Sequence, residues 1–208
     1  MTSKRSPAER TELSDGRMLM AAKQLIIQRG THKTSLKEVG ERAGYSRGLA
    51  SSRFGSKENL FRHITALYEQ KWRQYVSEFT AGKKGVDALL ARIDAVEAIL
   101  NNEPEEVRAV YTIWFESVSD HSSLHKQLQE YNSHGRDRLV QVIREGIDSG
   151  DISSDIDADS CTIAYLSHMF GLIYQWLVSP EDIDLGKSLE NLKGYCTFVL
   201  KPANQVGR

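Results

Sequence analysis

Apolar residues recur along almost the whole chain at the three- and four-residue spacing of an amphipathic helix, and no stretch alternates strictly like a half-buried strand. Near the start, Met18, Ala22, Leu25 and Ile26 follow this spacing and Gly30 supplies a stop signal. The pattern predicts a first helix over about 16–29 and eight more over about 35–44, 46–55, 57–80, 86–101, 104–118, 122–149, 157–178 and 184–200. We therefore expect an all-α fold of nine helices.

Helix-start signals support several of these boundaries. Ser35 and Glu38 have the spacing of a capping box, and Ser46 and Ser56 precede the next two helices as N-caps. Pro104 suits the first turn of a helix, where its missing N–H costs nothing.

Three short N-terminal helices, with a tight glycine-containing turn between the second and third, describe a helix-turn-helix. In that motif the last helix lies in the major groove of DNA. The stretch "AGYSRGLASSRFGSKENL" suits this role because it is small and basic. Ala50 and Phe54 can face the core while the side chains between them point outward. The spacing alone fits an ordinary short connector equally well.

The charge distribution favours an anionic partner for the first part of the chain only. Residues 1–60 carry 12 Lys and Arg against 6 Asp and Glu, whereas residues 61–208 carry 15 against 22, within a net charge of −1. Arg47 has the donors to bond a guanine edge, and serine hydroxyls can bond either partner of a base pair. The free N–H groups at the helix start of Thr34 and Ser35 favour a phosphate, and Lys57 can reach another.

Other classes of site find little support in the sequence. No nucleophile elbow, P-loop, dinucleotide fingerprint or zinc signature occurs, so we expect neither an enzyme nor a cofactor. His121 and His125 stand four residues apart beside Asp120, but no third ligand completes a metal site. Cys161 and Cys196 lie in apolar helical contexts, which indicates buried thiols in a reducing cytosol, with a disulfide or redox pair as the alternative.

Membrane and export signals are also missing from the pattern. No apolar run approaches the eighteen or so residues of a membrane span, and the start "MTSKRSPAER" does not have the form of a secretory signal. We expect a cytoplasmic protein without a membrane partner.

Residues 17–61, "RMLMAAKQLIIQRGTHKTSLKEVGERAGYSRGLASSRFGSKENLF", closely resemble the N-terminal domain of the TetR family of transcriptional regulators. The shared elements are the paired alanines of the first helix, Gly30, the hydroxyls Thr34-Ser35, "AGYSRG" and "RFGSKENLF". The stretch "FGLIYQWLVSPEDIDLGKSLENL" is similar to the last two helices of many such regulators. Residues 80–155 match only in helical pattern.

The resemblance implies a set of DNA-binding residues, namely Thr34, Ser35, Ser46, Arg47, Gly48, Ser51, Ser52, Arg53 and Lys57. The family usually carries Leu-Tyr where this chain has Ala50-Ser51, and that tyrosine commonly touches DNA. Either Arg53 or Arg47 takes over the contact, or the groove helix docks at a different depth. Leu49 either contacts a thymine methyl or packs inward.

An aromatic stripe runs along the helix expected over 57–80. It is either plain core or the wall of a small-molecule pocket. Each buried N–H or O–H group of its tyrosines and tryptophan must find a hydrogen-bond partner, and a core rarely has so many such groups. With the family resemblance, the stripe predicts an effector pocket lined by Tyr68, Trp72, Tyr75, Tyr111, Trp114, Phe115 and Tyr174.

Residues 161–178 are apolar on nearly every face, so this helix needs cover on both sides. A second subunit in a four-helix contact is the natural cover. The expected dimer interface comprises Tyr165, His168, Gly171, Leu172, Gln175, Leu192 and Cys196.

Together these expectations describe a DNA-binding domain (1–60) and an effector-binding and dimerisation domain (61–208). The function expected is that of a ligand-responsive repressor, which binds a palindromic double-stranded DNA operator as a homodimer and is released by a small, mainly apolar effector. The alternatives are an architectural DNA-binding protein without an effector and, from another class, an all-α enzyme or carrier.

Overall fold

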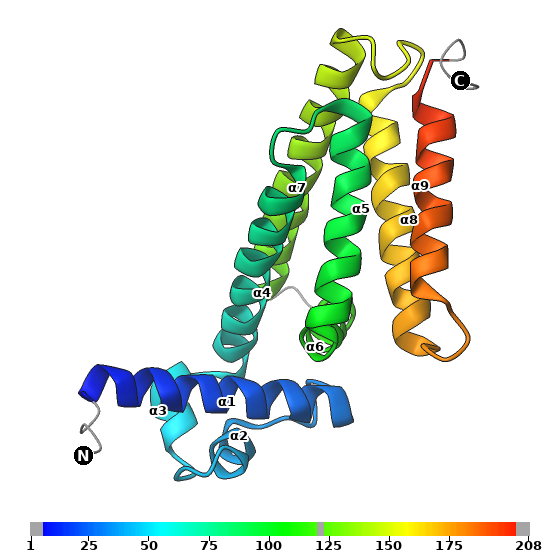
Figure 1. The fold of residues 1–208 in the computed structure, drawn as a ribbon. Helices are drawn as coiled ribbons and strands as arrows, with labels where there is room; N and C mark the ends of the chain where they lie inside the picture. Colours follow the sequence, from blue (N-terminus) through cyan, green and yellow to red (C-terminus); the bar gives the residue numbers. More distant parts are fainter. Residues whose placement is uncertain (1–5, 120–122, 203–208) are drawn as a thin grey trace, which may run out of the picture. The chain divides into compact units, whose positions relative to one another are not determined.

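The computed structural model describes residues 6–119 and 123–202, and these form nine α-helices, one short 3₁₀ helix and no β-strand (Figure 1). The predicted all-α fold is confirmed. The helices are α1 (Pro7–Arg29), α2 (Leu36–Arg42), α3 (Leu49–Phe54), α4 (Lys57–Thr80), α5 (Gly85–Asn102), α6 (Pro104–Glu116), the 3₁₀ helix η1 (Ser117–Ser119), α7 (Ser123–Asp148), α8 (Ala158–Val178) and α9 (Leu185–Leu200).

The first helix begins nine residues earlier than its apolar pattern predicts. Ser6 is the N-cap, its hydroxyl accepts the N–H of Glu9 at 3.2 Å, and the Glu9 carboxylate accepts the N–H of Ser6 at 2.6 Å. Pro7 occupies the first helical position, where proline is favoured. Residues 7–15 carry few apolar side chains, so a search for periodicity alone passes over this start.

The predicted N-cap of the third helix is also displaced. Helix α3 begins at Leu49 with Gly48 as its N-cap, and no side chain caps it. The carbonyl oxygen of Ser46 instead accepts the N–H of Leu49 at 3.1 Å, which closes a turn before the helix. The start expected at Ser56 does agree with the structure, since its hydroxyl accepts the N–H of Asn59 at 3.0 Å.

The chain divides into two compact units that do not follow its sequence order. The N-terminal unit is formed by the chain up to Gln70 together with Pro104–Leu128, and the C-terminal unit by Lys71–Glu103 together with the chain from Gln129. Residue 60, where the sequence predicts a domain boundary, lies within the N-terminal unit, which also includes α6. The predicted two-domain division by function stays a prediction.

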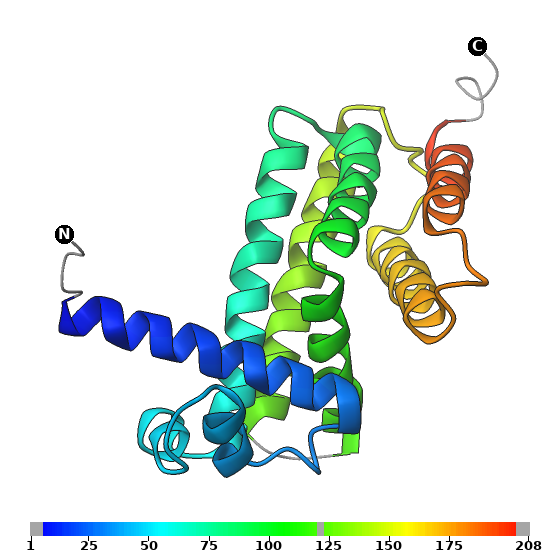
Figure 2. The ribbon, with the colours of Figure 1, turned by 60° about the horizontal axis from the view of Figure 1, so that its bottom comes forward.

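In the N-terminal unit, α1 packs against α2 and α6, and α2 packs against α3 (Figures 1 and 2). Two polar contacts fasten α6 to α1 and to the loop after it. Lys23 forms an ion pair at 3.2 Å with Glu106, whose side chain is only 6% exposed. The Glu116 carboxylate accepts the N–H of Thr31 at 2.9 Å and also its hydroxyl. The fully buried side chains of this unit include Met18, Ala22, Ile26, Val39, Ala50 and Leu60.

In the C-terminal unit, α9 packs against α5 and α8, and Figures 1 and 2 show α8 and α9 side by side. The Tyr165 hydroxyl on α8 donates to the carbonyl oxygen of Leu89 on α5 at 2.8 Å, and Lys193 on α9 pairs with Asp94 on α5. The core holds Leu89, Ile93, Leu139, Ile143, Ile152 and Leu189, all at most 1% exposed. Each such side chain contributes roughly 1.5–3 kcal/mol by leaving water.

Candidate DNA-binding and effector sites

The backbone between α2 and α3 makes a turn that requires glycine at two positions. Gly44 has a φ of +81°, in the left-handed region that other residues rarely adopt. Gly40 is buried, and a Cβ there would lie 2.7 Å from the backbone oxygen of Ser46. This close approach sets α3 tightly against α2 and produces the helix-turn-helix expected from the sequence.

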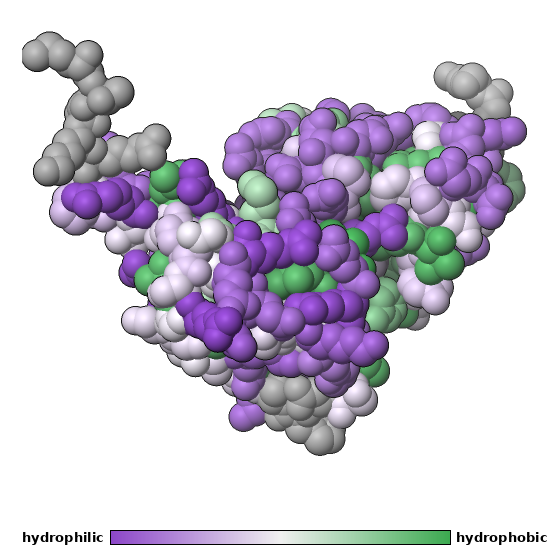
Figure 3. Space-filling view, turned by 90° about the horizontal axis from the view of Figure 1, so that it is seen from below, coloured by the Kyte–Doolittle hydropathy of each residue, from purple (hydrophilic) through white to green (hydrophobic). Residues whose placement is uncertain are grey.

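Helix α3 turns small and polar residues outward. Ala50 is fully buried and Phe54 is partly buried, whereas Gly48, Ser51 and Ser52 are exposed. Figure 3, a view from below Figure 1, shows a mostly hydrophilic (purple) surface with smaller hydrophobic (green) patches. A short helix with small polar side chains outward can approach base edges in the major groove without steric conflict.

The two arginines expected to contact DNA each have a carboxylate partner in the free protein. Arg47, whose side chain is 72% exposed, pairs with Glu41 on α2. Arg53 pairs with Asp15 on α1 at 2.9 Å and is 37% exposed. Exposed pairs of this kind contribute only about 0.2–1 kcal/mol, so a phosphate or a guanine can displace the carboxylates.

The residues expected to contact phosphates lie in three different settings. Thr34 is only 2% exposed and its hydroxyl donates to the Gly30 carbonyl oxygen at 2.9 Å, so the structure places it inside the unit rather than on its surface. Ser35 is exposed, and its hydroxyl caps α2 by accepting the N–H of Glu38 at 3.4 Å. Lys57 donates to the carbonyl oxygens of Thr31 and His32, at 3.0 and 3.3 Å.

Two lysines that the sequence reasoning passed over extend this surface. Lys33 and Lys37 are exposed, and neither forms an ion pair within the part of the chain that the structure describes. The signal was present in "THKTSLKEV", where one lysine precedes and one follows the Thr34-Ser35 pair. Their positions beside the start of α2 suit contacts with the DNA backbone.

Four of the seven residues expected to line an effector pocket gather in the N-terminal unit. Tyr68 on α4 meets Trp114 on α6 edge to face, with ring centroids 5.6 Å apart. Tyr111 lies 5.3 Å from Trp114 and 6.0 Å from Phe115, and half of the Phe115 surface is exposed. Aromatic rings at these separations favour one another, and the exposed ring keeps the cluster open to solvent.

The other three predicted pocket residues lie in the C-terminal unit with partners of their own. The ring of Trp72 lies under the guanidinium of Arg92, whose Cζ is 5.7 Å from the ring centroid. Tyr75 accepts a hydrogen bond from the Asn102 side chain at 3.2 Å. Tyr174 on α8 is 49% exposed.

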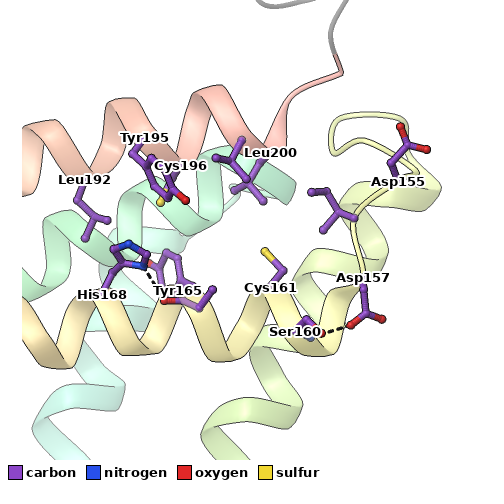
Figure 4. Close-up of a pocket in the computed structure, with 13 residues that line it drawn as sticks. Asp155, Asp157, Ser160, Cys161, Tyr165, His168, Leu192, Tyr195, Cys196 and Leu200 are labelled. Atoms are coloured by element: carbon purple, nitrogen blue, oxygen red, sulfur yellow. Dashed lines mark hydrogen bonds between the residues drawn. The ribbon is translucent and has the colours of Figure 1, made fainter.

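Two adjoining hollows separate α8 from α9. One is a groove of about 530 Å³, and His168, Gly171, Leu172, Gln175 and Leu192 of the predicted dimer interface line it. The other hollow, of about 290 Å³, is lined by the remaining two predicted interface residues, both of which are buried. Figure 4 shows their side chains facing this space from the two helices. These two are Tyr165 and Cys196.

Both thiols line the smaller hollow and are free (Figure 4). Burial raises the pKa of the Cys161 thiol, with a further contribution from the carboxylate of Asp157, and burial raises the pKa of Cys196 to about 11. A thiol with a raised pKa remains protonated near neutral pH and is a poor nucleophile. The structure therefore agrees with a buried thiol for Cys196, whereas Cys161 is only partly buried.

The histidine pair falls partly outside the described residues, which exclude Asp120 and His121. The ring of His125 contacts the Ser117 carbonyl oxygen through Nδ1 at 3.1 Å. Within residues 6–119 and 123–202, no cluster of three or more His, Cys, Asp or Glu side chains could hold a metal ion. Over the same residues, no helix combines the length and apolarity needed to cross a membrane.

Comparisons with known proteins agree with this geometry. Residues 18–64 match the family model of bacterial regulatory proteins of the tetR family, and residues 85–200 match the C-terminal region of BetI-type transcriptional repressors. The HTH-type transcriptional regulator AcrR of Shigella flexneri is 26% identical over 174 residues, which cover 82% of this chain and 81% of AcrR.

Solved structures share the fold at lower identity. NalD, the secondary repressor of the MexAB-OprM multidrug efflux pump in Pseudomonas aeruginosa, is 18% identical with a TM-score of 0.75, covering 93% of this chain and 99% of NalD. A SmeT–triclosan complex is 19% identical, also with a TM-score of 0.75, and covers 91% and 92% of the two chains. With the helix-turn-helix at one end and family matches over both parts, the chain belongs to the tetR family of bacterial regulatory proteins and is a transcriptional regulator rather than an enzyme.

Proposed function

We propose that the protein is a ligand-responsive repressor that binds a palindromic operator as a homodimer and is released by a small, mainly apolar effector. The observation that carries the proposal is the α2–α3 turn. It combines a glycine-dependent close approach with an outward face of Gly48, Ser51 and Ser52, next to two exchangeable arginines.

On DNA, Arg47 bonds a guanine edge, and Arg53 takes a phosphate or a base in place of the tyrosine that the family usually carries. The serine hydroxyls of α3 supply neutral contacts. Lys33 and Lys37 neutralise phosphates beside the start of α2, a contribution that is independent of sequence and falls with added salt.

A homodimer is supported by the apolar surface of α8 and α9. Ile163, Val178, Tyr195 and Phe198 are 53%, 64%, 52% and 69% exposed. Tyr195 also lines the groove between the two helices, and exposed apolar surface of this kind is typical of an interface with another chain. A second copy using the same face would bury it and would pair two helix-turn-helix units with two-fold symmetry.

Effector binding is supported by the cluster of Tyr68, Tyr111, Trp114 and Phe115, and by the SmeT–triclosan complex, which shows a small molecule bound to a protein of the same fold. Release requires the effector to prefer the conformation whose two groove helices are wrongly spaced for DNA. A ligand with equal affinity for both conformations would shift nothing.

The test is selection of tight binders from a random DNA pool, followed by fluorescence anisotropy on the recovered site and a metabolite screen for release. We expect an inverted repeat, two protein chains per site and at least one compound that weakens binding. Affinity without sequence preference would favour the architectural alternative, and absence of DNA binding would overturn the proposal. Ser149→Ala, far along the chain from α3, serves as a control with unchanged affinity.

A further inference from the structure

A positively charged cluster in the C-terminal unit comprises the partly buried Arg92 and the exposed Arg138. Arg92 extends from α5 over the ring of Trp72 on α4 at 5.7 Å, and both side chains are partly buried. The hydroxyls of Tyr165 and Tyr131 lie close enough to Arg92 to affect its pKa, as does the guanidinium of Arg138 on α7. The guanidinium of Arg92 on α5 thus lies over a ring from α4 and near polar or charged groups of α7 and α8.

Among the residues that the structure describes, Arg92 has no carboxylate partner. Within the described residues, no Asp or Glu forms an ion pair with either Arg92 or Arg138. The nearest acid along α5, Asp94, is already paired with Lys193 on α9. An arginine withdrawn from water is normally paired, because the loss of hydration costs several kcal/mol that only an anion repays.

The cost of withdrawing Arg92 from water appears in the pKa of its guanidinium. Desolvation lowers the pKa of Arg92, Tyr165 and Tyr131 act in the opposite direction, and Arg138 lowers it further because like charges repel. Desolvation is the largest of these effects, and the exposed Arg138 contributes the smallest, so Arg92 is a cation whose partial burial is not offset by a carboxylate among the described residues. Unpaired charge of this kind is a feature of binding sites.

We propose that this cluster binds an organic acid, whose carboxylate pairs with Arg92 and whose apolar body packs against Trp72. The inference rests on the proposed role of the protein as an effector-responsive repressor and names the class of the effector. Arginine presents a planar fork that matches a carboxylate through two parallel hydrogen bonds. The charge of Arg138, near enough to act on the pKa of Arg92, strengthens the attraction for a negative charge. An ammonium compound would instead meet repulsion.

The cluster remains accessible to a ligand. Arg92, Trp72 and Tyr131 each retain part of their surface exposed, whereas Tyr165 is buried and its hydroxyl already donates to Leu89. The exposed parts offer a charge and an aromatic face side by side. This combination recognises a molecule that is acidic at one end and apolar along the rest.

The test uses two pairs of probes with matched apolar bodies, octanoate with octanamide and 1-naphthoate with 1-naphthamide. Binding to the full-length protein is measured by isothermal titration and by the emission of Trp72 in a Trp114→Phe, Trp176→Phe background. We expect at least one acid to bind about tenfold or more tightly than its amide. That preference should vanish in Arg92→Gln and persist in Arg144→Gln, which removes an exposed arginine paired with Asp159.

Failure to fold does not obscure the result, because circular dichroism and thermal unfolding of Arg92→Gln should match or exceed the wild type when an uncompensated charge is removed. Equal binding of acid and amide, retention of the preference in Arg92→Gln, or no binding of either acid at millimolar concentration would each overturn the proposal. Operator release is measured separately. An Arg92-dependent acid that leaves the operator bound supports the anion site and contradicts its effector role, whereas release by the amides alone supports the repressor and contradicts the anion site.

Discussion

In the N-terminal unit, Arg47 and Arg53 lie at the surface and each is paired with a carboxylate, whereas Arg92 in the C-terminal unit is largely withdrawn from water and has no carboxylate partner among the described residues. The exposed pairs cost little to form and little to break. The enclosed charge is costly to keep in place. The contrast indicates two ways of preparing for an anion. In the N-terminal unit, the arginines form weak ion pairs that a polyanion can replace. In the C-terminal unit, a single arginine has no carboxylate partner among the described residues and is available to a small anion.

The largest expected effect tests the exposed side of this contrast. Arg47→Ala should cost roughly 1–3 kcal/mol of binding free energy on the selected operator and relax the preference at one base, because a guanine contact is lost. Fluorescence anisotropy with operator variants measures both changes. Arg144→Ala, which removes an exposed arginine of the C-terminal unit, should bind like wild type, and equal affinity of Arg47→Ala would contradict the groove role of α3.

The next effect tests the enclosed side. Arg92→Met should raise the free energy of unfolding by roughly 1 kcal/mol, because a partly buried charge without an anion is replaced by an apolar side chain of similar length. For a chain of this size the unfolding temperature should rise by about 2–4 °C. Calorimetry without ligand measures the shift. Arg144→Met should change stability little, and a clear destabilisation by Arg92→Met would show that the contact of Arg92 with the Trp72 ring outweighs the cost of withdrawing its charge from water.

A substitution of Lys57 distinguishes a structural role of this side chain from a role in DNA binding. Because its Nζ donates to the carbonyl oxygens of Thr31 and His32, Lys57→Met should lower the free energy of unfolding by roughly 1 kcal/mol. Urea denaturation without DNA measures this change. Should the variant be as stable as wild type while the salt dependence of DNA binding flattens by about one ion, Lys57 acts as a phosphate contact instead.

A smaller effect is expected from the partner of Arg47. Glu41→Gln removes the carboxylate that DNA must displace, so operator affinity should increase by roughly 0.2–1 kcal/mol, most clearly at low salt. Glu190→Gln, which loosens a pair with Lys193 in the C-terminal unit, is the matched control. Weaker binding by Glu41→Gln would mean that the pair positions Arg47 rather than restrains it.

The smallest effect concerns the thiols. Burial raises the pKa of Cys196 to about 11, whereas an unfolded cysteine ionises near a pKa of about 8.5. The unfolded state therefore releases this proton first, so the stabilisation is complete below pH 8.5 and is lost as the pH rises toward 11. Under reducing conditions, the stability difference between wild type and Cys196→Ala should shrink over that range. Parallel curves would show that Cys196 ionises equally well in both states.

Sequence pattern was sufficient for the helices because their apolar spacing and caps are local. Ser56 and Pro104 mark helix starts as expected, and Gly44 closes the segment after α2. The early start at Pro7 depended on a capping box in a polar stretch, which carries no periodicity. The N-cap at Gly48 depended on the approach of the turn to Gly40, which a one-dimensional pattern does not contain.

The sites were less accessible to prediction because they depend on contacts between distant segments. Thr34 has the composition of a surface residue, yet its hydroxyl returns to the Gly30 carbonyl and its side chain is buried. Helical spacing places Trp72 in the same aromatic stripe as Tyr68, but the Trp72 ring lies under Arg92, twenty residues further along, whereas Tyr68 meets Trp114. A periodic pattern places an arginine on a helix, but it does not show whether a neighbouring helix supplies a carboxylate to pair with it.

The way α6 is fastened to α1 limits how this protein can be recombined. A chimaera that exchanges residues 1–60 with those of a relative would leave Glu106, only 6% exposed, without Lys23, and Glu116 without the Thr31 hydroxyl, unless the donor supplied equivalents. The transferable module is therefore discontinuous, since it comprises the first seventy residues and Pro104–Leu128. Engineers who graft a new operator specificity onto this scaffold should move both segments, or retain the host residues of α1 that meet α6.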